Sequence, residues 1–177
     1  MKNLKTLVAS IEASNKEFSK MTPAEKRVAI AQDCIDRINL GQLRGTTGTV
    51  IDVSCKFDYG DSLKDLLSTK TKSLQCSVCA KGGLFMSYIG RVNEFTFNDL
   101  DYTNTLNGSE MEKLKEIFNW EQLSLIETAF EGQQYTGKLT YEDVETAEKF
   151  YDRFSQDTRR LKEICKNIVK NKGTFVV

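Results

Sequence analysis

Cys76 and Cys79 lie three residues apart in this sequence. Of all the residue patterns in the chain, this pair most resembles part of a reactive or metal-binding site. A C-x-x-C pair is half of many structural zinc sites, in which two thiolates approach one ion. The same spacing at the start of a helix is typical of a redox dithiol, because the helix dipole stabilises a thiolate there. Two adjacent glycines follow, Gly82 and Gly83, and they favour a third interpretation, close packing of this segment against another element.

Both chemical interpretations lack a further part. The chain contains no histidine, so a zinc site needs two more ligands from carboxylates or from Cys34, Cys55 and Cys165, which form no second close pair. The flanking tryptophan and intervening proline of a redox motif are also missing. The sequence favours close packing and predicts no cofactor and no metal. A thiol-dependent enzyme using Cys76 and Cys79, and a structural zinc module that contacts nucleic acid, stand as alternatives.

The absence of histidine also bounds the classes of function. It removes Ser/His/Asp and Cys/His nucleophile systems, together with the commonest general base. Neither glycine-rich phosphate-binding motif occurs, and 25 acidic residues supply carboxylate pairs by chance. We therefore predict that the protein is not an enzyme.

A basic run near the end of the chain, "RRLKEICKNIVKNKG", is the second candidate for a functional site. The cations that we predict to bind a partner are Arg159, Arg160, Lys162, Lys166 and Lys170. Several lie opposite the apolar residues of the same helix, which predicts a basic stripe beside an apolar one. Such a stripe suits an acidic protein groove or nucleic acid, and a solvated helix end is the simpler alternative.

Charge is segregated along the chain although the net charge is zero. Residues 1–93 carry 14 basic and 9 acidic groups, residues 94–147 carry 3 and 12, and residues 148–177 carry 8 and 4. This layout argues against a protein that coats nucleic acid with its whole surface, and it favours local acidic or basic contact surfaces.

The elements that position these residues are predicted to be mostly helices. Capping patterns and apolar periodicity predict helices in the first twenty residues, from Pro23 to Gly41, near 62–68, over 76–92, and from Ser109 and Asn119 onward. The β-branched segment 46–57 predicts the best strand, and residues 93–100 a second one. We expect a single domain over residues 1–177, of the α+β class, predominantly helical with a small β-sheet.

A long C-terminal helix over residues 140–171 is predicted from an apolar stripe with steps of three and four. The stripe comprises Val144, Ala147, Tyr151, Phe154, Thr158, Leu161, Cys165 and Ile168. Such a helix would span about 45 Å, more than a small domain needs. Either a homodimer covers the stripe, or the helix lies across other helices of its own chain, and the sequence leaves both open.

The sequence also bears on location. Charged residues begin too early for a signal peptide, and no apolar run is long enough to span a membrane. The five cysteines are an odd set that suits buried thiols in a reducing compartment. We expect a cytoplasmic protein without membrane contact.

Three segments, "MTPAEKRVAIAQDCIDRI", "CSVCAKGGLFMSYIGRVN" and "WEQLSLIETAFEG", resemble a group of small bacteriophage and prophage accessory proteins with a C-x-x-C-A-x-G helix. The three segments cover about a third of the chain, and Gly83 stands where the group has alanine. The resemblance implies a mobile-element protein of the set that includes anti-CRISPR and other anti-defence inhibitors. It implies action in the bacterial host cell on a protein or nucleoprotein complex, such as a CRISPR-type or other nuclease effector, by occupying its surface.

Overall fold

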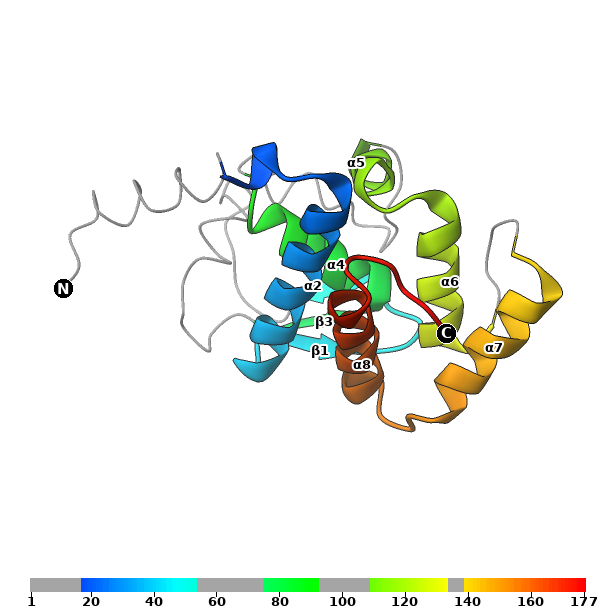
Figure 1. The fold of residues 1–177 in the computed structure, drawn as a ribbon. Coiled ribbons are helices and arrows are strands. Elements are labelled where there is room, and N and C mark those ends of the chain that lie inside the picture. The colour runs from blue at the N-terminus through cyan, green and yellow to red at the C-terminus, as the bar shows by residue number, and fades with distance from the viewer. Residues whose placement is uncertain (1–16, 54–74, 93–108, 134–138) are drawn as a thin grey trace.

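The computed structural model describes residues 17–53, 75–92, 109–133 and 139–177. The predictions for the first sixteen residues, for Cys55, for the helix near 62–68 and for the strand over 93–100 lie outside these ranges. The described residues form an α+β fold, mostly helical with a small mixed sheet, which confirms the predicted class (Figure 1). None of the described helices is both long and apolar enough to cross a membrane.

Helix α2, Pro23–Asn39, begins where its capping box predicts. The Glu25 backbone N–H donates to Thr22 Oγ1 at 3.3 Å, and the Thr22 backbone N–H donates to Glu25 Oε2 at 2.8 Å. These reciprocal bonds satisfy backbone donors that a helix N-terminus leaves without partners. The helix ends at Asn39, and its C-cap Leu40 directly precedes Gly41, the residue at which the sequence predicts a stop.

Helices α5, Ser109–Ile117, and α6, Trp120–Glu131, also begin where the sequence predicts. Asn119 caps α6 by accepting the Gln122 N–H at 2.8 Å. Gly132 ends α6 in the left-handed conformation, with φ of 77°, which glycine adopts without steric cost. Together these helices cover one side of the core (Figure 1).

The sheet contains three short strands in the order β1-β3-β2: β1 Leu43–Gly45, β2 Ile51–Val53 and β3 Cys76–Val78. Strand β3 runs parallel to β1 and antiparallel to β2, so it is central. The strand predicted over residues 46–57 corresponds to β2 where the structure describes it, and β1 is not among the predicted strands. The helix predicted from Cys76 is wrong for its first residues, because Cys76 pairs in β3 and Cys79 is the N-cap of the helix that follows.

That helix, α4 Ala80–Ile89, lies at the centre of the fold, and all of its residues are buried. The two glycines of α4 permit other elements to pack directly against its backbone. A Cβ atom on Gly82 would collide with the Val50 carbonyl oxygen, and one on Gly83 would lie 3.3 Å from Leu161 Cδ2 and 3.4 Å from Cys34 Sγ. The close packing predicted for this segment is therefore confirmed.

The continuous helix predicted over residues 140–171 is wrong, because the segment forms two helices, α7 Tyr141–Asp152 and α8 Asp157–Lys170. Thr140 caps α7 as predicted, because its Oγ1 accepts the Asp143 backbone N–H at 3.1 Å. The break at residues 153–156 lets α7 pack on α6 while α8 packs on α2 (Figure 1). One straight helix could not bury both halves of its stripe on the same small domain.

The apolar stripe of α8 is covered by its own chain. Leu161, Cys165 and Ile168 are completely buried, and α8 lies along α2. In α7, Ala147 is buried and Val144 is half-buried. The uncovered stripe that would have required a homodimer is therefore absent from α8.

Candidate partner-binding surface

Four of the five predicted basic residues lie on the outer side of α8. Arg159, Lys166 and Lys170 are exposed, and Lys162 is half-buried. Their spacing of three, four and four residues places them on one face. Lys162 Nζ donates to Asn39 Oδ1 at 2.6 Å, which ties the start of α8 to the end of α2. We call these four cations the α8 basic face.

Arg160, the fifth predicted cation, does not belong to this face, because it is only 2% exposed. Its guanidinium donates to the carbonyl oxygens of Phe130 at 2.9 Å and Phe154 at 2.6 Å, and to Asp157 Oδ1 at 3.0 Å. It also lies 3.8 Å from the centre of the Tyr151 ring. The prediction that Arg160 binds a partner is therefore wrong. This side chain instead joins the ends of α6 and α7 to the start of α8.

Cys76 and Cys79 are buried and belong to no disulfide. Cys79 Sγ accepts the Gly82 backbone N–H at 3.4 Å and so caps α4. Burial raises the pKa of the Cys79 thiol to about 11, and the carboxylates of Glu127 and Glu131 add to the rise. The thiol is therefore protonated at neutral pH, whereas reactive cysteines are accessible and have a low pKa.

The remaining described cysteines are equally enclosed. Cys34 on α2 and Cys165 on α8 are completely buried. A hydrogen bond with the Cys34 side chain, together with burial, raises the pKa of Cys165 well above its ordinary value. Among the described residues, no three side chains of His, Cys, Asp or Glu come together in a way that could hold a metal ion.

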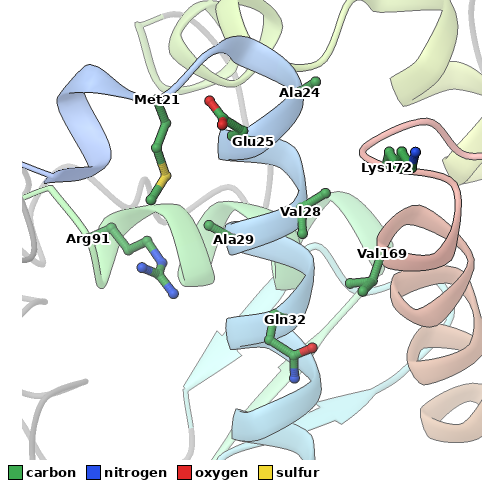
Figure 2. Close-up of a pocket in the computed structure, with 9 residues that line it drawn as sticks. All are labelled: Met21, Ala24, Glu25, Val28, Ala29, Gln32, Arg91, Val169 and Lys172. Carbon is green, nitrogen blue, oxygen red and sulfur yellow. The ribbon is translucent and has the colours of Figure 1, made fainter.

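A groove that the sequence did not predict lies over the outward face of α2 (Figure 2). Its volume is about 730 Å³. Its apolar lining consists of Met21, Ala24, Val28, Ala29 and Val169, and its polar lining of Glu25, Gln32, Arg91 and Lys172. We call it the α2 groove. Three of its apolar residues are half-buried members of one helix, and small half-exposed side chains of this kind give little signal in a sequence.

The margins of the α2 groove carry most of its charge. Arg91 follows α4 and Lys172 follows α8, and the two lie on opposite sides of α2 (Figure 2). Arg91 also stacks over the Phe18 ring, 5.8 Å from its centre. Since Val169 and Lys172 belong to the end of α8 and the turn after it, the groove adjoins the α8 basic face.

Three carboxylates outside the α2 groove and the α8 basic face have structural partners. Glu127 forms a salt bridge with Lys81 of α4, and both side chains are largely buried. Glu131 accepts the Gly48 backbone N–H at 2.9 Å, and burial raises the pKa of Glu131. Asp157 accepts the Thr47 backbone N–H at 2.9 Å. The contacts of Glu131 and Asp157 hold the segment between β1 and β2 against α6 and α8, whereas the salt bridge of Glu127 joins α6 to α4.

Comparison of the chain with protein families, with curated proteins and with solved structures finds no match. Its function must therefore be inferred from the arrangement of the described residues.

Proposed function

We propose that the chain is a bacteriophage-type accessory protein that inhibits or modulates a host complex by occupying part of its surface. The observation that carries the proposal is the α2 groove, an open apolar depression of about 730 Å³ with cations on both sides. An exposed apolar depression with a polar rim is typical of an interaction site, since monomeric surfaces rarely leave one uncovered.

The α8 basic face extends this surface. Lys170 and Lys172 take part in no ion pair among the residues that the structure describes, and Arg159 is engaged only with the Phe154 ring among the same residues, 5.6 Å from its centre. Cations that are exposed in this way suit an acidic protein surface or the phosphates of a nucleoprotein. The proposed partner is a complex of the bacterial cytoplasm such as a CRISPR-type or other nuclease defence effector.

The buried thiols support a binding role over chemistry by the chain itself. Catalysis by Cys79 needs a thiolate that reaches its substrate, and this thiol is enclosed and protonated at neutral pH.

The proposal is tested by expressing the chain in bacterial strains that each carry one nuclease-based defence system. The measurement is the efficiency of plaquing of a phage that the system restricts, with a strain lacking the system as control. We expect plaquing to rise in at least one strain and to stay unchanged in the control. Accumulation of folded protein without a rise in any strain would contradict the proposal.

A further inference from the structure

The α2 groove has the dimensions of a site for one helix. From Ala24 to Gln32 the axis of α2 rises about 12 Å, slightly more than two helical turns. Ala24 and Ala29 have short side chains, so an incoming helix can approach the backbone of α2 at a normal packing distance. A partner helix with apolar residues at positions i, i+4 and i+7 would place them along Val28 and its apolar neighbours.

The charged residues on the margins of the groove indicate which charge the flanks of the partner helix carry. Arg91 and Lys172 lie on both sides of the N-terminal half of α2 (Figure 2). The acid of the groove lining, Glu25, already accepts the Thr22 backbone N–H and hydroxyl, each at 2.8 Å. These hydrogen bonds lower the pKa of Glu25, so its carboxylate compensates the start of α2.

The opposite end of the groove is lined by an uncharged polar side chain. Gln32 lies there and donates to Asp36 Oδ1 at 3.0 Å, one turn further along α2. Among the described lining residues, the cations therefore lie on the two margins of the groove, and its Gln32 end carries no charge. We propose that it binds an amphipathic helix of a protein partner whose acidic flank lies against Arg91 and Lys172. This inference rests on the proposed function and names the partner chemistry of the same surface.

Two other occupants fit the charge less well. Residues 1–16 contain an apolar stripe, but they carry Lys2, Lys5 and Lys16 against Glu12, which would add positive charge beside Lys172. A second copy of the chain in a two-fold arrangement would bring the same cationic margins together. An acidic helix meets neither repulsion.

The test is a selection of helical peptides from a random display library on the immobilised full-length chain. We expect enriched peptides to be negatively charged, with apolar residues at helical spacing. Enrichment of neutral or basic peptides would overturn the inference, and so would a selection that enriches nothing above background.

Variants then locate the site with an enriched peptide as the probe. Val28→Asp places a charge in the centre of the groove and should weaken binding at least about tenfold. Val176→Asp makes the same change at an exposed valine outside the groove lining and should leave binding unchanged. Equal affinities of the two variants would overturn the inference.

Charge reversal supplies a second readout that does not depend on the fold of α2. Lys172→Glu should weaken binding by up to about fivefold and reduce its salt dependence. Lys149→Glu, at an exposed lysine of α7, is the matched control. An unchanged salt dependence in Lys172→Glu would contradict the acidic flank.

Two measurements on the same samples test the two other occupants, residues 1–16 and a second copy of the chain. Displacement of the probe by a synthetic peptide of residues 1–16, or a dimer mass in light scattering that Val28→Asp reduces to a monomer, would replace the inference with an intramolecular or self-paired site. Because the selection uses no host component, its failure is distinguishable from failure of the plaquing assay.

Discussion

Substitution of Arg160 by methionine should remove a large part of the stability of this fold. The guanidinium is buried and donates to the carbonyl oxygens of Phe130 and Phe154 and to Asp157, and methionine offers none of these bonds. Loss of one partner from a buried charged network costs about 3–5 kcal/mol. The low end applies here, because Asp157 is partly exposed and retains its bonds to Thr47. We therefore expect a loss of about 3 kcal/mol, a substantial fraction of the 5–15 kcal/mol typical of a domain.

The adjacent arginine provides the matched control. Arg159 is exposed and lies over the Phe154 ring with its Cζ 5.6 Å from the centre, so Arg159→Met should cost less than about 1 kcal/mol. Urea unfolding followed by far-UV circular dichroism measures both free energies of unfolding. Arg160→Lys distinguishes geometry from charge, since lysine keeps the charge but cannot reach several carbonyls at once. Equal losses in Arg159→Met and Arg160→Met, or wild-type stability in Arg160→Lys, would refute the role assigned to this guanidinium.

Further predictions concern the centre of the fold, its pH dependence and its thiols. Gly82→Ala should destabilise by about 1–3 kcal/mol despite the higher helix propensity of alanine, because its Cβ would collide with the Val50 carbonyl oxygen. Gly83→Leu should cost more than about 1 kcal/mol through overpacking against Leu161, and an unchanged unfolding midpoint would contradict the close contact. Because burial raises the pKa of Glu131, the folded state favours its protonated form, so this contribution to stability is present at low pH and lost as pH rises through the folded pKa. Glu131→Gln should therefore be more stable than wild type at neutral pH, with a difference that shrinks in acid, as followed by thermal unfolding across a pH series. Hydrogen bonds from Thr140 lower the pKa of Asp143, so Asp143→Asn should show the opposite sign, a loss at neutral pH that fades in acid. In a thiol titration, Cys34, Cys76, Cys79 and Cys165 should react only after unfolding, and fast reaction of any of them in the native protein would contradict their burial.

The local rules of helix capping account for what the sequence predicts correctly. Thr22 with Glu25, Asn119 with Gln122, and Thr140 with Asp143 are contacts between residues three apart, so each can be recognised without knowledge of the fold. The strands are harder to predict, because β1 and β3 contain three residues each and are stabilised by pairing between distant segments. A run as short as Cys76–Val78 has no periodicity of its own that would distinguish it from a helix start.

The break between α7 and α8 shows a second limit. Residues 153–156 contain neither proline nor glycine, and the apolar stripe continues through Phe154 and Thr158 without a change of step. Tertiary contacts accompany this break, among them the bonds that Arg160 donates to the carbonyl oxygens of Tyr151 and Phe154. Arg160 does lie four residues before the buried Ile164, on the apolar side of α8, and this phase distinguishes it from Arg159.

The claim that this molecule acts through the α2 groove and not through its thiols is tested most directly by two variants in the plaquing assay. Cys79→Ser removes the thiol but keeps a hydroxyl that can cap α4, whereas Val28→Asp leaves the thiol and blocks the groove. Circular dichroism is the check that both variants are folded. In a bacterial strain where the wild-type chain raises plaquing, we predict that Cys79→Ser still raises it and that Val28→Asp does not. Loss of the effect with Cys79→Ser and its full retention with Val28→Asp would contradict this account.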